Sequence, residues 1–78
     1  MFEKIYRSST PFFDTYHIYD PVKGQYVGIL EDHSRGVKHR YFIGWHFPNG
    51  HYIPGSRQPG QTKMFDTEVE AIKYITEG

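Results

Sequence analysis

The sequence predicts an α+β fold, a single small domain in which an antiparallel β-meander of four or five strands carries one C-terminal α-helix on one face. Three observations support this prediction. The chain has 78 residues, enough for one small hydrophobic core. Its apolar side chains are rich in rings, with seven Tyr, six Phe and one Trp, and such residues favour strands. Apolar residues at helical spacing occur only near the C-terminus.

Strands are expected at residues 2–7, 13–20, 26–31, 37–47 and 51–54. Polar and turn-forming residues separate them. The segment 8–11 is Ser-Ser-Thr-Pro, and the segment 20–24 combines a Pro, which presets one backbone dihedral angle, with a Gly, which accepts a positive one. Ser34-Arg35-Gly36 marks a further turn. Short β-prone runs joined by such turns are typical of antiparallel strands that follow one another across a sheet.

The run of residues 37–47 has the clearest alternation in the chain. Its odd positions are mostly apolar or aromatic, whereas its even positions include Lys38, Arg40 and His46. If the odd positions face the core, Trp45 is buried and the cations of the even positions are exposed. The sequence leaves open which face of the sheet the helix covers.

Asn49-Gly50 predicts a tight hairpin turn that brings Phe47 opposite Tyr52, because both turn residues tolerate positive φ angles. Residues 54–64 show no periodicity and contain two Pro and two Gly, so we expect a long loop there.

The C-terminal helix is expected over residues 67–77. Thr67 and Glu70 have the spacing of a capping box, in which side chains of the first turn bond to free backbone N–H groups. Val69, Ile72 and Ile75 then recur at helical spacing and supply one apolar face.

The charges are unevenly distributed along a chain that is neutral as a whole. Nine Lys and Arg balance nine Asp and Glu, yet residues 33–64 contain five cations and no carboxylate. The flanking segments hold all nine acidic residues. An asymmetry of this kind has two interpretations: the basic segment binds an anionic partner, or the acidic flanks neutralise it within the folded chain. The candidate partner-binding residues combine four of these five cations with a His of the preceding strand and the hairpin tip, and they are Arg35, Lys38, Arg40, His46, Asn49, Gly50, Tyr52 and Arg57.

No motif for catalysis or for a cofactor is present in the sequence. The absence of Cys removes disulfides, thiolate zinc sites and cysteine nucleophiles. The five His allow a metal hypothesis in which His46 and His51 flank the hairpin turn, but a third ligand is missing from that segment. We therefore predict no catalytic residue, no metal site, no cofactor and no enzyme activity.

The segment Phe65-Asp66-Thr67-x-x-Glu70-Ala71-x-x-Tyr74, placed after a small antiparallel sheet, resembles the end of plant AP2-type and phage-integrase arm-binding domains. Those domains press a three-stranded sheet into the DNA major groove. The resemblance covers about ten residues, and the pattern is common to capped helices that follow a strand. No functional residue is transferred from it, and no family is assigned.

Three functions are compatible with these observations. The leading one is a small non-catalytic protein that docks onto a larger macromolecule, with a protein as the expected partner, as inhibitors and adaptors of viruses and mobile elements do. The second is a nucleic-acid-binding domain that uses the basic sheet face and the loop, and the third is a small His-dependent metal protein or enzyme. We expect a soluble protein of the cytoplasm, or of the host cytoplasm if it is viral. No apolar run approaches the ~20 residues of a membrane span. Whether it is a monomer or a homodimer stays open.

Overall fold

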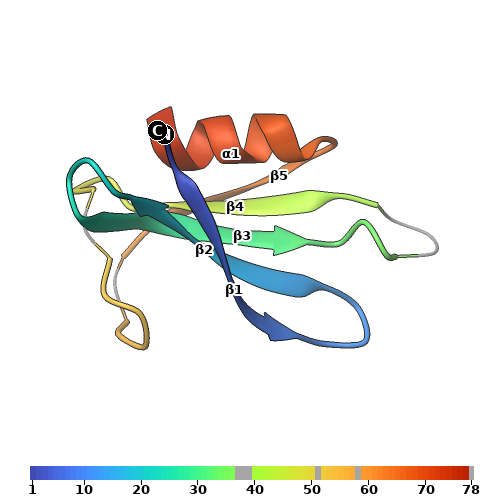
Figure 1. The fold of residues 1–78 in the computed structure, drawn as a ribbon. Helices are drawn as coiled ribbons and strands as arrows, with labels where there is room; N and C mark the ends of the chain where they lie inside the picture. The colour runs from blue at the N-terminus through green and yellow to red at the C-terminus, as the bar shows by residue number, and fades with distance from the viewer. Residues whose placement is uncertain (37–39, 51, 58, 78) are drawn as a thin grey trace.

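Five strands and one helix make up the described part of the computed structural model, which comprises residues 1–36, 40–50, 52–57 and 59–77 (Figure 1). The elements are β1 (Glu3–Ser9), β2 (Asp14–Asp20), β3 (Gln25–Asp32), β4 (Phe42–His46), β5 (Gln61–Phe65) and α1 (Glu68–Glu77). The strands form one antiparallel sheet in the order β1-β2-β3-β4-β5. The predicted α+β fold, an antiparallel meander with a C-terminal helix on one face, is confirmed.

The helix starts where Thr67 caps it, because the Thr67 hydroxyl accepts a hydrogen bond from the Glu70 backbone N–H at 3.2 Å. It packs across β3, β4 and β5. The buried core lies between the helix and the sheet. It consists of Ile18, Val27, Leu30, Ala71 and Ile75, with partly buried Tyr16, Phe42, Phe65 and Ile72 around it. Figure 1 shows the helix on one side of the sheet only.

Two strand glycines allow the helix to lie close to the sheet. A Cβ atom at Gly28 would overlap the Trp45 carbonyl oxygen and lie 2.5 Å from Cγ2 of Ile75. A Cβ at Gly44 would lie 3.2 Å from the Ala71 carbonyl oxygen. Glycine in a strand is typical of such close approach. The helix therefore covers the face that carries these two glycines.

This arrangement decides the assignment of faces in the fourth strand. The sequence left open which face the helix covers, and the structure excludes the alternative with the odd positions toward the helix, because Gly44 and the other even positions of β4 face it. Trp45 lies on the opposite face and is only partly buried. The reason is steric: the helix backbone packs against glycine, whereas the larger Ile43 and Trp45 would hold it away.

The strand pairing after β4 also differs from the prediction. The segment 52–54 is not a strand, and Tyr52 forms only an isolated bridge to Tyr26. Residues 61–64 were expected within the loop of 54–64, but together with Phe65 they form β5 and pair with β4. Most of β5 is exposed on both faces, so burial imposes no alternation on its sequence. The described part of the expected strand 37–47 is ordered as a strand only over Phe42–His46.

Candidate binding surfaces

The predicted basic residues do not gather on one surface. Arg40 and Arg57 are both exposed, but one precedes β4 and the other follows it. Strand β4 is roughly 17 Å long, and Arg40 precedes one of its ends while the connection that carries Arg57 leaves from the other. Lys38 lies outside the described residues. Among the residues that the structure describes, Arg40 and Arg57 therefore do not form a continuous patch on β4.

Arg35 connects two loops of the molecule. Its Nη2 donates to the Thr10 carbonyl oxygen at 2.6 Å and to Oδ1 of Asp14 at 3.0 Å. Ser9 donates its hydroxyl to the same Asp14 oxygen at 2.6 Å. The pKa of the Asp14 carboxyl is lowered by this Ser9 hydrogen bond and, to a smaller extent, by Arg35. The guanidinium thus ties the β3–β4 connection to the β1–β2 connection, which gives Arg35 a structural role.

His46 and Tyr52 are both engaged within the fold. His46 lies under the helix, where its Nδ1 is 3.0 Å from the Ile75 carbonyl oxygen, and an N–H at that position donates to it. Tyr52 is buried, with its ring stacked on Phe47 at 4.5 Å between centroids. That ring contact matches the predicted proximity of Phe47 and Tyr52. Neither His46 nor Tyr52 is free to meet a partner in this conformation.

The tip of the predicted hairpin forms a turn of a different kind. The Gly50 N–H donates to the Phe47 carbonyl oxygen at 2.8 Å, so the turn spans residues 47–50. Gly50 has φ of +63°, whereas Asn49 keeps a negative φ, so the turn is not of the expected type with two positive φ angles. Asn49 is exposed at its tip.

The opposite face of the sheet carries a row of apolar and aromatic side chains. We call it the helix-free face. Cross-strand pairing places Ile5, His17, Ile29 and Trp45 side by side on four strands. Ile43 and Met64 are paired in the next row on the same face. Ile5, Ile29, Ile43 and Trp45 are partly exposed, and Met64 is 68% exposed. Tyr52 packs against His17, whereas the apolar side chains of the row and of the next row keep part of their surface exposed.

A stack of three aromatic rings lies at one end of the helix-free face. His33 lies between Phe13 and Tyr41, with centroid distances of 4.5 and 4.3 Å and nearly parallel planes. Its Nε2 is 3.0 Å from Oε1 of Glu31. This stack joins residues from three different segments of the chain, so it fixes the position of an aromatic surface at this end of the sheet.

The other end is closed by a cluster of rings under the connection that follows Tyr52. His17 contacts Tyr52 and Tyr26 edge-on at 5.3 and 6.1 Å, and Tyr19 packs against Tyr26 at 5.0 Å. In Figure 1 this connection descends from the sheet on the side away from the helix. The open part of the helix-free face is therefore its centre and the end near Tyr41.

The helix-free face has few charges, and one of its His residues is held neutral. His17 is 8% exposed, and its Nδ1 has no hydrogen-bond partner among the described residues. Burial lowers the pKa of His17 below its ordinary value of 6.5, and the positive charge of Arg7 lowers it further. On the helix side, a hydrogen bond of 2.7 Å to Glu68 raises the pKa of Lys4.

The sequence reasoning missed Ile5, Ile29, Ile43 and Met64 as candidate surface residues. Their importance depends on the face that the helix covers, which periodicity did not decide. Gly28 and Gly44 were the signal that could have decided it, because a glycine inside a strand often marks close backbone approach. Both glycines lie on the face opposite to these residues.

No group of three His, Cys, Asp or Glu side chains is placed to hold a metal ion within the described ranges. Helix α1, in the part of the chain that the structure describes, is too short and too polar to cross a membrane. No protein-family model, curated protein sequence or solved structure matches this chain.

Proposed function

We propose that this protein is a non-catalytic binding module that docks onto a larger protein through the helix-free face of its sheet. The observation that carries the proposal is the central row of the sheet, in which the apolar side chains of Ile5, Ile29 and Trp45 stay partly exposed. Its activity is occupation of a partner's surface, as in inhibitors and adaptors. Half-exposed apolar side chains on a rigid sheet lose little conformational freedom when a partner buries them.

The residue types on this face suit a protein partner. Trp and Tyr are enriched among the residues that dominate binding energy at protein interfaces, and Trp45 lies in the row while Tyr41 lies at its open end. Five strands spaced by about 4.8 Å make a face roughly 20 Å wide. A face of that width accommodates the footprint of an ordinary protein interface, about 800 Å² on each partner.

The charges favour a protein over a nucleic acid. Binding of DNA or RNA depends on Lys and Arg side chains that neutralise phosphates. The described charged residues of the helix-free face include the carboxylates of Glu3 and Glu31. Arg7 is the cation near His17. Arg40 and Arg57 lie beyond opposite ends of β4, so they do not line one phosphate path.

The test compares two exposed apolar residues on different surfaces. Met64 is 68% exposed on the helix-free face, and Val69 is 78% exposed on the helix. Tagged wild-type protein, Met64→Glu and Val69→Glu are purified from the native cell and weighed by native mass spectrometry. We expect wild type and Val69→Glu to carry a protein partner and Met64→Glu to lose it. A carboxylate that is buried at an interface without a hydrogen bond or an opposite charge weakens binding.

Two results would overturn the proposal. One is a complex that Met64→Glu retains as fully as wild type does. The other is a bound nucleic acid in place of a protein, whose affinity falls steeply as salt rises. The double variant Arg40→Glu with Arg57→Glu shows whether the exposed cations, rather than the helix-free face, hold the partner. Loss of the complex in this variant, with retention in Met64→Glu, would move the docking surface to the two arginines.

A further inference from the structure

The two edges of the sheet differ in how they are protected. On the β1 edge, the register shifts between Tyr6 and Ser8, and the strand carries Glu3, Lys4 and Arg7. Bulges and charges on an edge strand discourage the addition of a further strand. The β5 edge pairs with β4 in continuous register, and its residues from Gln61 to Met64 are exposed. Strand β5 therefore offers unpaired backbone N–H and C=O groups along a regular edge.

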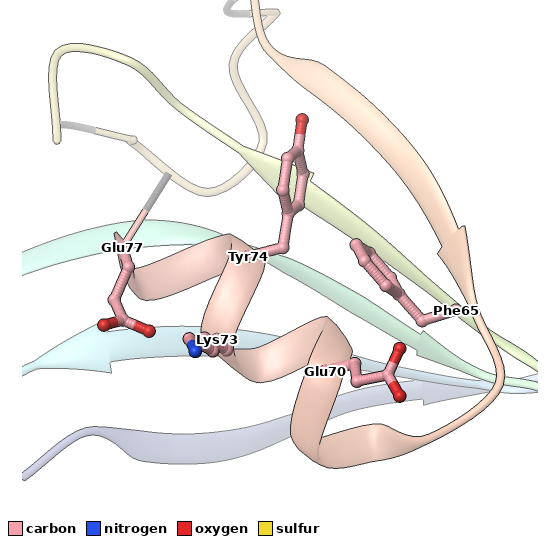
Figure 2. A pocket seen from close by; sticks show the side chains of 5 residues that line it. All are labelled: Phe65, Glu70, Lys73, Tyr74 and Glu77. Atoms are coloured by element: carbon pink, nitrogen blue, oxygen red, sulfur yellow. The ribbon is translucent and has the colours of Figure 1, made fainter.

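An open groove lies beside β5 on the helix side. It has a volume of about 370 Å³ and is lined by Phe65 at the end of β5 and by Glu70, Lys73, Tyr74 and Glu77 of α1. Figure 2 shows the Phe65 and Tyr74 rings between the helix and β5. Their centroids are 5.4 Å apart, and the Tyr74 hydroxyl is within 3.4 Å of Oε1 of Gln61. The groove is thus apolar at its floor and runs along the strand with the free edge.

The charge of the helix rim is negative. Glu70 and Glu77 are both exposed, and Figure 2 shows them toward opposite ends of the groove with Lys73 between them. Lys73 offsets one of the two carboxylates. The ammonium of Lys63, which projects from β5, lies 5.8 Å from the centre of the Tyr74 ring. The attraction of this cation for the ring favours a position over Tyr74.

We infer that the β5 edge and the adjoining groove bind an extended peptide segment of a partner, which adds to the sheet as a sixth strand. Backbone pairing with β5 supplies affinity, and alternate side chains reach the groove. Seven residues of helix separate Glu70 from Glu77 by about 10 Å. In an extended peptide, side chains four residues apart on one face are about 13 Å apart. The matching pattern is therefore basic-x-apolar-x-basic, with the apolar side chain against Phe65 and Tyr74.

A second copy of this chain fits the groove less well. Its own β5 offers Lys63 and Phe65 two residues apart but lacks a second basic residue on the other side of the ring. Antiparallel pairing of two β5 strands centred on Lys63 would also place the two ammonium groups opposite each other, which is unfavourable. The groove lies on the helix side of β5, opposite to the helix-free face, so this inference does not rest on the proposed function.

The experiment is a titration of ¹⁵N-labelled protein, followed by backbone amide shifts, with the blocked peptide Thr-Lys-Thr-Leu-Thr-Lys-Thr. The comparison peptide has Glu in place of both Lys. We expect the basic peptide to shift the amides of β5 and of Lys73 to Glu77, and the acidic peptide to leave them unchanged. Equal shifts with both peptides, or shifts confined to other regions, would overturn the inference.

Two further arms test the charge and the strand pairing separately. Glu77→Lys is expected to weaken binding of the basic peptide about fivefold, while the matched charge reversal Glu3→Lys on the far edge leaves it unchanged. Only alternate N–H groups of an added strand face its neighbour. Of two peptides, one N-methylated at all odd residues and one at all even residues, we therefore expect at least one to lose binding. Equal weakening by the two charge reversals, or full binding of both methylated peptides, would contradict strand addition at β5.

Discussion

The two faces of the sheet have opposite character although the same strands form them. On the helix side, Ile18, Leu30 and Ile75 are almost completely buried. On the helix-free face, Ile29 and Trp45 remain partly exposed in the middle of the sheet. Ile29 and Leu30 are neighbours in β3, so the difference arises from the position of α1 and not from the local sequence. The helix side stabilises the fold, and the helix-free face leaves apolar area exposed.

The His residues of the two faces also differ in their hydrogen bonds. His46 on the helix side is bonded to the Ile75 carbonyl oxygen at 3.0 Å, so its polar ring contributes to helix packing. His17 on the helix-free face is buried among Tyr rings, and its Nδ1 lacks a partner among the described residues. A buried polar atom without a partner reduces stability.

The largest expected effect concerns the glycine that allows the helix to approach. Gly28→Ala places a Cβ against the Trp45 carbonyl oxygen and Ile75, so we expect a loss of about 3 kcal/mol or more in the free energy of unfolding. Gly55→Ala is the control. Its φ of +88° strains an added Cβ, but no atom lies within 4 Å, so about 1 kcal/mol is expected. Urea denaturation measures both, and equal losses would show that helix packing does not depend on Gly28.

The next effect compares adjacent residues of β3. Leu30→Ala removes a fully buried side chain and should cost about 2–5 kcal/mol. Ile29→Ala removes a partly exposed side chain from the helix-free face. It should cost about 1 kcal/mol, because the Ile29 side chain buries less apolar area than that of Leu30. The two variants are compared by urea denaturation of the isolated protein. If Ile29→Ala were as damaging as Leu30→Ala, the helix-free face would be a second core and not a free surface.

A smaller effect is a pH dependence that originates at His17. Its pKa in the folded protein lies below the ordinary 6.5, so the unfolded chain takes up a proton first as the pH falls. The contribution of neutral His17 is complete above pH 6.5 and is lost as the pH falls from 6.5 through the folded-state pKa. His17→Phe keeps a ring against Tyr26 and Tyr52 and removes the proton site. We expect the variant to lose less stability than wild type between pH 7.5 and 5, and equal losses would contradict this origin.

The α+β fold and the capped helix follow from the sequence because their signals are local. Thr67, with Glu70 three residues later, marks the helix start, and the hydroxyl of Thr67 indeed accepts the Glu70 N–H. The turn at 20–24 is equally local: Asp20 accepts hydrogen bonds from Val22 and Lys23, and Gly24 has φ of +66°. Such features depend on neighbouring residues alone.

The candidate surface did not follow from the sequence because it depends on contacts between distant residues. A count of apolar positions assigns Ile43 and Trp45 to the core, whereas the approach of Ile75 to Gly28 and Gly44 decides the opposite. Strand β5 was missed for a related reason, since an exposed edge strand such as residues 61–65 needs no alternation. Arg35 was read as a binding residue, yet most of its contacts join segments more than 20 positions apart.

Trp45 provides the measurement that decides whether the helix-free face is the docking surface. It is the chain's one Trp and lies in the central row of that face, so its emission reports on that face without a label. The complex isolated from the native cell is compared with the free protein, using a partner-only sample to subtract the partner's emission. Burial by the partner should shift Trp45 emission to shorter wavelength and reduce its quenching by acrylamide. A complex of confirmed mass in which the emission and quenching of Trp45 stay as in the free protein would contradict the proposal.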